Sequence, residues 1–420
     1  LTEESEEKES VDLEEEWEVI NSAKALWTRT RTEIADDEYN EFYKYLTHDF
    51  SDPLTWSHNK VEGKLEYTSL LYIPEKAPFD LWNRESPRGL KLYVERVFIM
   101  DEAEQFLPLY LRFVKGIIDC NDLPLNVSRE ILQQDERVVS IRGALTKRVL
   151  NTLNKMATKE PSQYEKFWEE FGEVLKEGAG EDFSNRESLA KLLRFNSTNQ
   201  SDKPTKNVAL DDYLDRSSGS QEKIYYLVAD SYENARNSPH LEVYKVNNVE
   251  VLLLFDRIDE WVMSMLTEYQ GKKFHDVARG EVEVGEEKQD EAESAEEASD
   301  HTELNERIKK ILSDKVENVR ASKRLTESAA CLVLGEFGVS SQMRRMMEAS
   351  GQPVPESKPD FEYNAKHPLI KRLDLEQQEE GFARLLNIIF DQAALAEGRP
   401  LEDPSGYVNR LNDLLVDLLN

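Results

Sequence analysis

The spacing of apolar residues along the chain predicts both strands and helices. Short, nearly continuous apolar runs are typical of buried strands. They lie at residues 70–73, 91–100, 223–229 and 250–255, and residues 61–67 form a further segment that is predicted as a strand. Apolar residues three or four positions apart predict amphipathic helices. They lie at residues 36–46, 138–156, 164–171, 188–195, 256–269, 305–319, 382–393 and 408–419.

Two of these patterns are informative about topology. The run from Lys91 to Met100 alternates at first and then becomes continuously apolar at residues 97–99, which predicts a buried strand. The runs at 223–229 and 250–255 are separated by a short helical segment. Continuous apolar strands on either side of a helix predict a small β-α-β unit whose sheet is covered on both faces.

Polar and acidic stretches separate these elements. Residues 1–18 are dominated by Glu and Ser, residues 198–207 are polar and contain Pro204, and residues 280–300 are half acidic. Such stretches bury too little apolar surface to fold alone and are typical of linkers. The predicted segments are an acidic linker at 1–18, a large α/β unit with a helical connector at 19–200, a small α/β unit at 201–279, a second acidic linker at 280–302 and a C-terminal domain at 303–420.

Length and charge narrow the class of protein. With 420 residues, the chain is too long for one hydrophobic core. Its net charge of −31, from 53 basic and 84 acidic residues, argues against nucleic acid and against anionic membranes as partners. Cys120 and Cys331 lie far apart, which predicts a reducing compartment, the cytoplasm, without a disulfide framework. Apolar runs such as Val251–Phe255 are too short to span a bilayer.

An arginine at the start of a predicted helix is the first candidate for chemistry. Pro124 ends any preceding element, Ser128 is a good N-cap and Glu130 suits the first helical turn. Arg129 does not, because a cation opposes the helix dipole there. One interpretation is a surface arginine paired with Asp122 or Glu130. The other is an anion contact, because the guanidinium is a five-donor fork that suits phosphate.

Other sites of known chemistry are not predicted by any motif in the sequence. Gly271-Lys272-Lys273 lacks the upstream glycine of a phosphate-binding loop. There is no Gly-x-Ser-x-Gly motif, and the six histidines and two cysteines do not have zinc spacing, so we predict no metal site.

Three apolar clusters each have a structural and a functional interpretation. Trp261 has core spacing with Ile258 and Met265, and the methionines at 343, 346 and 347 suit either a core or an adaptable binding surface. The last helix must dock on its own domain or on a partner chain. Two adjacent amphipathic helices at a terminus suit a four-helix bundle across a two-fold axis. Their apolar residues are Phe382, Leu385, Leu386, Ile389, Phe390, Leu411, Leu415 and Leu418.

Longer stretches of the sequence carry a family resemblance. LPLNVSREILQ at 123–133, with LWTRT at 26–30 before it, resembles the catalytic loop of the ninety-kilodalton heat-shock chaperone family, most closely its bacterial members. The similarity extends over nearly the whole chain. It includes residues 53–84, 89–108, 171–178, 189–198 and 257–268.

The resemblance implies a role for the arginine loop. Arg129 would contact the γ-phosphate of ATP bound with Mg²⁺ in a separate N-terminal domain, and Asn126 and Gln133 would be its neighbours in the loop. That domain's signatures, a helix-borne Glu and Asn and an Asp-x-Gly-x-Gly turn, are missing here. The chain also opens at Leu1 in an acidic tract. We therefore expect a fragment that binds no cofactor and is inactive alone, although the full-length protein resembles an ATPase.

The resemblance also implies an architecture and partners. The expected fold class is multi-domain α/β and α+β. A middle domain of two α/β units joined by a helical connector would precede a mixed C-terminal domain that ends in a helical dimerisation bundle. Unfolded or partly folded client proteins, and other chaperones of the stress response, would be partners of the homodimer. The client-binding residues would be Glu260, Trp261, Phe337, Met343, Met346 and Met347.

A second function from a different class remains open on the sequence. An acidic scaffold could bind partners through dimerisation alone, without coupling to nucleotide. A self-contained phosphoryl-transfer enzyme is disfavoured, because the phosphate-binding motifs are missing.

Overall fold

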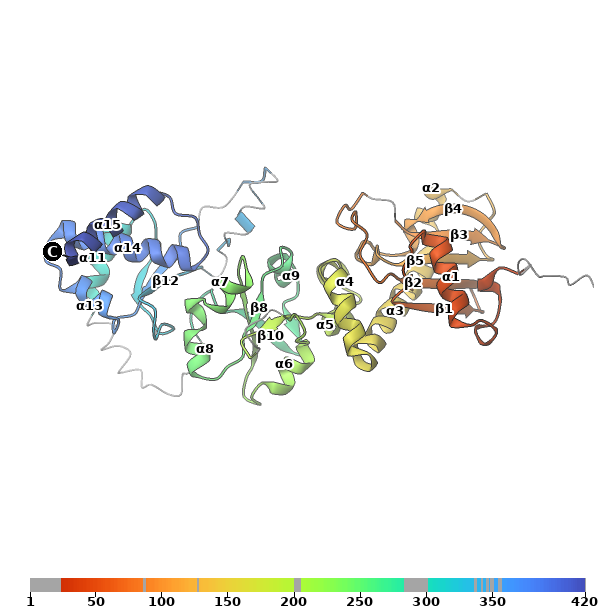
Figure 1. The fold of residues 1–420 in the computed structure, drawn as a ribbon, viewed down its shortest axis with the longest axis horizontal. Helices are drawn as coiled ribbons and strands as arrows, with labels where there is room; N and C mark the ends of the chain where they lie inside the picture. Colours follow the sequence, from red (N-terminus) through yellow and green to blue (C-terminus); the bar gives the residue numbers. More distant parts are fainter. Residues whose placement is uncertain are drawn as a thin grey trace, which may run out of the picture. The chain divides into compact units, whose positions relative to one another are not determined.

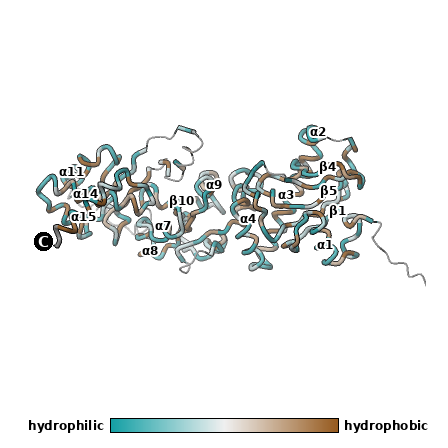
Figure 2. The backbone as a smooth tube through the Cα atoms, turned by 45° about the horizontal axis from the view of Figure 1, so that its top comes forward, coloured by the Kyte–Doolittle hydropathy of each residue, from teal (hydrophilic) through white to brown (hydrophobic). Residues whose placement is uncertain are grey.

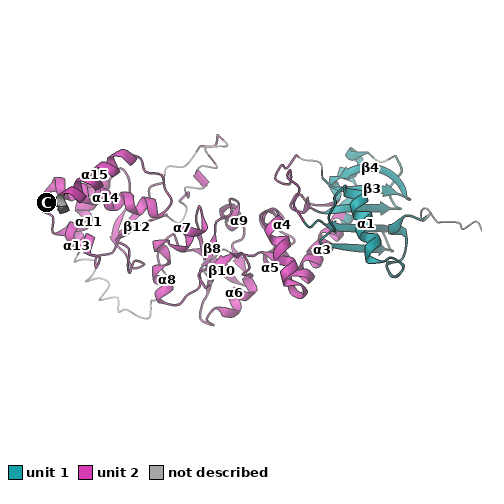
Figure 3. Ribbon diagram, viewed as in Figure 1, with its two compact units in different colours: residues 1–75, 87–106, 114–141 teal, residues 76–86, 107–113, 142–420 magenta. Residues whose placement is uncertain are grey.

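The computed structural model describes residues 24–85, 88–126, 128–199, 205–282, 301–335, 338–340, 343–344, 347, 351–353 and 357–419, with side chains to residue 416. Its contacts divide the chain into two compact units (Figure 3). Unit 1 comprises residues 1–75, 87–106 and 114–141, and unit 2 comprises residues 76–86, 107–113 and 142–420. Helix α3 (Glu136–Lys159) begins in unit 1 and ends in unit 2.

Unit 1 is built on a sheet that has five strands among the described residues (Figure 1). The strands are β1 (Thr55–Val61), β2 (Tyr67–Ile73), β3 (Leu90–Val94), β4 (Val97–Ala103) and β5 (Lys115–Cys120). Their order across the sheet is β1-β2-β5-β3-β4. In this order β5 is the central strand, and β1 and β4 are the edge strands. Strands β3 and β5 pair in parallel, and the other neighbouring strands pair antiparallel.

Helix α1 (Asp36–Thr47) forms the core of unit 1 with strands β2 and β5. Tyr39, Tyr43 and Leu46 are spaced by four and three residues, so they share one helical face and are buried. Trp27 is 8% exposed in the same core, and its Nε1 donates a hydrogen bond to Asp119 Oδ2 at 2.9 Å. Trp27 therefore belongs to the core of unit 1.

Two strand predictions in unit 1 are wrong. Residues 61–67 are mainly the turn between β1 and β2, because the strand itself begins earlier, at Thr55. Residues 91–100 are a hairpin that turns at Glu95 and Arg96, both with positive φ. Val97 and Phe98 lie on the edge strand β4 and are 52% and 51% exposed. An apolar run therefore marks an exposed edge here, not a buried strand.

The first part of unit 2 combines long helices with a second sheet. The helices are α4 (Pro161–Glu181), α5 (Arg186–Leu192), α6 (Leu210–Arg216), α7 (Tyr232–Arg236), α8 (Glu242–Val246) and α9 (Asp259–Met265). The strands are β6 (Asn196–Ser197), β7 (Lys223–Val228), β8 (Leu252–Leu254), β9 (Glu268–Tyr269) and β10 (Lys272–Asp276), in the order β6-β8-β7-β10-β9. Strands β7 and β8 are parallel and α7 lies between them in sequence, so the predicted β-α-β unit is confirmed.

The last part of unit 2 packs helices on a small sheet ordered β11-β13-β12. The strands are β11 (Val319–Ala321), β12 (Ala330–Val333) and β13 (Asp360–Tyr363), and the helices are α11 (Thr302–Leu312), α13 (Pro368–Asp374), α14 (Glu379–Ala396) and α15 (Pro404–Leu419). In Figure 2 the helices alternate between hydrophobic and hydrophilic colours along their length, as amphipathic helices do. The mixed α/β and α+β class is confirmed.

Two helices of unit 2 are shorter than their apolar periodicity predicts. The helix expected at 256–269 is α9, which ends at Met265. The chain then enters a hairpin whose turn, Gln270-Gly271, has positive φ at both residues. The helix expected at 305–319 is α11, which ends at Leu312, and Val319 begins strand β11. In both places apolar residues of a following strand extended the helical pattern.

Candidate functional site

Two buried leucines anchor the loop that carries Arg129. Leu123, after strand β5, is 4% exposed, and Leu132, in helix α2 (Arg129–Gln134), is 1% exposed. The residues described between these two anchors are all exposed. Ser128 caps α2 as predicted, because its Oγ accepts a hydrogen bond from the Ile131 N–H at 3.4 Å.

Polar contacts hold the ends of this loop in place. The Asp122 carboxylate accepts a hydrogen bond from the Glu66 N–H at 2.6 Å, which ties the loop to strand β2. Arg137 donates to the Asp122 carbonyl and, through Nε, to Asp135 Oδ1 at 2.9 Å. The hydrogen bonds from Arg137 lower the pKa of the Asp135 carboxyl. The loop is thus an exposed segment on a fixed base.

Arg129 faces solvent on this base. Its side chain is 56% exposed, and its Nη2 lies 3.8 Å from Oε2 of Glu102, which is 43% exposed. The structure pairs it with Glu102 rather than with Asp122 or Glu130, the partners that the structural interpretation predicted. Two side chains this exposed gain little from their attraction, about 0–1 kcal/mol. The guanidinium is therefore easily released to an anion.

The other two residues predicted for this loop, Asn126 and Gln133, are close to Arg129 in sequence. Asn126 is exposed in the loop, and Gln133 is exposed on α2. Glu102 is the residue that the sequence analysis missed. It lies on edge strand β4 with φ of 57° and is brought to Arg129 only by the fold, so no local sequence signal identifies it.

The sequence model of the Hsp90 protein family matches residues 2–420. The chain belongs to the Hsp90 family. The match spans both compact units, so it does not depend on one motif. Membership supports a chaperone-type function. Among the described residues of this Hsp90 chain, no helix is long and apolar enough to cross a membrane.

The client-binding residues predicted on α9 have structural neighbours in this Hsp90 chain. Trp261 is half-buried and lies over Gly180 of α4, where an added Cβ would be 2.4 Å from its ring. The predicted core register of Ile258, Trp261 and Met265 is wrong. The buried face of α9 carries Asp259, Val262 and Met263 instead, and Met265 is 38% exposed.

A polar junction joins α9 to the segment that carries the methionines. Glu260 accepts hydrogen bonds from Arg279 Nη2 at 3.1 Å and from the Ser340 hydroxyl. The Ser340 Oγ also accepts from the Met343 N–H at 3.1 Å. Residues 260 and 343 are thus brought together, although they are distant in sequence. Met343 and Met347 are half-buried, whereas Phe337 and Met346 lie outside the described residues.

The apolar residues predicted for dimerisation fall into two groups in this Hsp90 chain. Phe382, Leu386 and Ile389 of α14 have at most 1% of their surface exposed and belong to the core of the C-terminal part, with Leu385 and Phe390 packed against them. Leu411 is half-buried and Leu415 is 50% exposed on α15, and the Leu418 side chain lies outside the described set. The exposed apolar face is on α15, where it includes Val408 and Val416 at 51% and 55%.

Proposed function

We propose that this chain is the client-binding and dimerising part of an ATP-dependent chaperone of the cytoplasm. In this proposal Arg129 contacts the γ-phosphate of ATP that is held, with Mg²⁺, by an N-terminal nucleotide domain. The single observation that carries the proposal is an exposed, weakly paired arginine on a fixed loop in a member of the Hsp90 family.

The geometry suits contact with a phosphate delivered from outside this chain. Leu123 and Leu132 fix the loop, so little conformational entropy is lost when the guanidinium binds an anion. An arginine can bind a phosphate through two parallel hydrogen bonds, which a lysine cannot. Arg129 would neutralise charge on the terminal phosphate and so favour the closed state of the dimer. ATP supplies the phosphoryl group and the free energy of the cycle.

The test of this role is Arg129→Ala in a full-length protein that includes the nucleotide domain. We expect a loss of ATPase rate of about 10²-fold or more, the scale for removing one stabilising donor at a transition state. Closure, measured by energy transfer between labelled protomers, should slow as well. Arg129→Lys keeps the charge and loses the fork, so it should be intermediate.

Arg372→Ala is the matched control for this experiment. Arg372 is 62% exposed on α13 and, like Arg129, pairs with one carboxylate, that of Glu376. It should leave ATPase rate and closure unchanged. Wild-type ATPase and closure in Arg129→Ala would overturn the proposed role. If an added nucleotide domain with ATP does not alter this chain's conformation, the acidic-scaffold function is favoured instead.

Dimerisation is proposed through the exposed face of α15, with α14 as its support. Leu415→Asp should break the dimer while the fold is kept, because Leu415 is half exposed in the single chain. Phe382→Ala should instead lower the free energy of unfolding by about 3–5 kcal/mol, because Phe382 is a core side chain. Light scattering and circular dichroism on both variants separate the two effects. A Leu415→Asp protein that remains dimeric would rule out this face.

Client binding is proposed where α9 meets Ser340 and Met343. Trp261 is half-buried next to Glu260 in α9, and Glu260 is linked through Ser340 to Met343. Unbranched, polarisable methionine side chains adapt to varied partners. Met343→Ser should weaken the binding of a destabilised model client more than Met100→Ser on strand β4 of unit 1. Equal binding by the two variants would contradict this assignment.

A further inference from the structure

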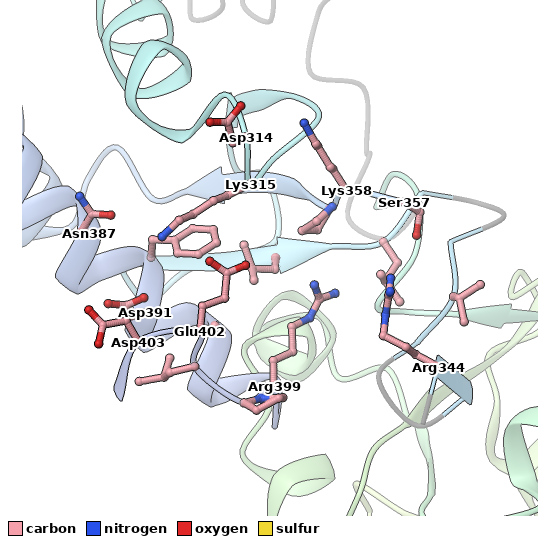
Figure 4. A pocket seen from close by; sticks show the side chains of 18 of the residues that line it. Asp314, Lys315, Arg344, Ser357, Lys358, Asn387, Asp391, Arg399, Glu402 and Asp403 are labelled. Carbon is pink, nitrogen blue, oxygen red and sulfur yellow. The ribbon is translucent and has the colours of Figure 1, made fainter. Parts of the chain in front are cut away.

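A cavity of about 600 Å³ opens in the C-terminal part of unit 2 (Figure 4). Its walls come from α14, the start of α15, the segment after β12 and the loops at 314–315 and 357–359. Its apolar lining includes Leu332, Leu334, Phe390, Ala394 and Leu401. Cavities of this size accommodate small organic molecules.

Most charged groups of the cavity already have partners. Arg410 Nη2 lies 2.7 Å from Asp391 Oδ2, and Lys315 Nζ lies 5.0 Å from the centre of the Phe390 ring. Lys358 donates to the Ser313 carbonyl at 3.1 Å. Asp403 accepts from the Gly406 N–H at 2.9 Å and so caps α15. The acidic residues Asp314 and Glu402 are exposed at the rim.

Arg344 and Arg399 are the two other cationic residues that line the cavity. Neither side chain makes a hydrogen bond or ion pair with another residue in the described ranges, although both line the cavity. Figure 4 shows both side chains extending toward the middle of the cavity. Burial lowers the pKa of Arg399; Glu397 opposes this shift and the charge of Arg344 adds to it. Two like charges that repel each other in a chain of net charge −31 are an uncommon arrangement.

Two further polar atoms of cavity-lining residues lack partners. The Ser357 Oγ and the Arg410 Nε are buried and make no hydrogen bond within the described residues. Buried polar atoms without a partner destabilise the folded state, so folded proteins keep few of them. Their presence beside two unpaired arginines points to a group that is bound in the cavity.

We propose that this cavity binds a small organic anion whose carboxylate or phosphate is held by Arg344 and Arg399, and whose apolar body packs on Phe390 and Leu332. Guanidinium forks bind both anionic groups through paired hydrogen bonds, and partial burial strengthens the attraction. An inorganic anion would leave the apolar wall empty, and a neutral ligand would leave the arginines unpaired. The site does not include Arg129.

The test uses the whole chain and isothermal titration calorimetry with four probes. Phenyl phosphate and phenylacetate carry the two candidate anionic groups on an aromatic body. The one that binds more tightly shows whether the site prefers a phosphate or a carboxylate. Inorganic phosphate lacks the body and benzyl alcohol lacks the charge. We expect saturable, one-to-one binding of at least one aromatic anion, at least tenfold tighter than either control probe. No saturable binding, or equal binding of benzyl alcohol, would overturn the proposal.

Variants locate the site. Arg399→Gln and Arg344→Gln should each weaken binding at least tenfold, while Arg372→Gln, an exposed arginine of the neighbouring α13, should leave it unchanged. Wild-type affinity in both cavity variants would disprove the location. Without ligand, Arg399→Gln should have an equal or higher Tm, because it removes a half-buried charge that has no ion pair within the described part of the chain. A lower Tm would show that Arg399 has a structural partner, which also contradicts the proposal. If Arg399→Gln does not fold, Arg344→Gln decides.

Discussion

Two cations show how differently the two units use charge. Lys176 on α4 is 2% exposed, and its Nζ lies 2.8 Å from Asp256 Oδ2 and 2.5 Å from Asp259 Oδ1. Arg129 in unit 1 is 56% exposed and lies 3.8 Å from one carboxylate. Lys176, with Gly180 and the α9 residues Asp259 and Trp261 that face them, forms what we call the α4–α9 seam.

The difference shows which charge can move. Burial acts to lower the pKa of Lys176, but the charges of Asp259 and Asp256 outweigh it and the pKa is raised. Removing such an ammonium from its carboxylates would leave buried charges uncompensated, so the contact is fixed. Arg129 is already in water, so its release from Glu102 costs little. An arginine that is to bind and release a nucleotide must be exposed and weakly paired, as Arg129 is.

The largest expected effect comes from breaking the seam at its charge. Lys176→Met leaves the buried Asp259 without a counter-ion, whereas Asp256 keeps its ion pair with Lys206, so the free energy of unfolding should fall by about 3–5 kcal/mol. Lys191→Met is the control, because Lys191 is 42% exposed and lies 3.9 Å from Glu187. It should change stability by less than about 1 kcal/mol. Denaturant unfolding measures both, and equal effects would remove the contrast between buried and exposed pairs.

A second effect tests the packing of the same seam. Gly180→Ala places a Cβ 2.4 Å from the Trp261 ring, so the ring must shift. We expect a destabilisation of about 1–3 kcal/mol, the usual scale for overpacking. Gly143→Ala in α3 meets nothing within 4 Å and should stabilise by about 0.5–1 kcal/mol through helix propensity. A thermal unfolding series on both variants decides, and a stabilised Gly180→Ala protein would show that the ring is free to move.

A third effect is pH dependence at another buried pair of unit 2. Burial acts to raise the pKa of Glu362, but Arg324 and the Ser322 hydroxyl outweigh it and the pKa is lowered from 4.5. A carboxyl group whose pKa is lowered by folding stabilises the protein at pH values above its ordinary, unfolded-state pKa. This stabilisation is lost as the pH falls through the pKa of the folded state. Stability below pH 4.5 should therefore fall more steeply in wild type than in Glu362→Gln. Identical acid profiles would contradict the pairing.

The smallest expected effect on stability is at Arg129, the exposed cation of the two. Arg129→Ala should change the free energy of unfolding by less than about 0.5 kcal/mol, because its side chain is mostly in water. Chemical unfolding of this chain alone provides the measurement. A loss as large as that of Lys176→Met would mean that Arg129 is structural and not available to a nucleotide.

Local sequence patterns were sufficient where one helix or one strand decides the outcome. Helix α1, the Ser128 cap and the β-α-β unit around α7 follow from periodicity and from single residues. The patterns failed where a neighbouring element decides. Phe98 is exposed because β4 has a partner on one side only, and Trp261 is only half-buried although it lies over Gly180 of α4, whereas Val262 is buried.

The sequence by itself determined the family, the order of the elements and the position of Arg129 at the start of a helix. It could not determine what that arginine contacts, because Glu102 reaches it only through the sheet. The same holds for the seam at Lys176 and for Arg344 and Arg399, which have no ion pair among the residues that the structure describes. Charge in a sequence has no fixed energetic value, because burial and partners set that value, and only the tertiary structure supplies both.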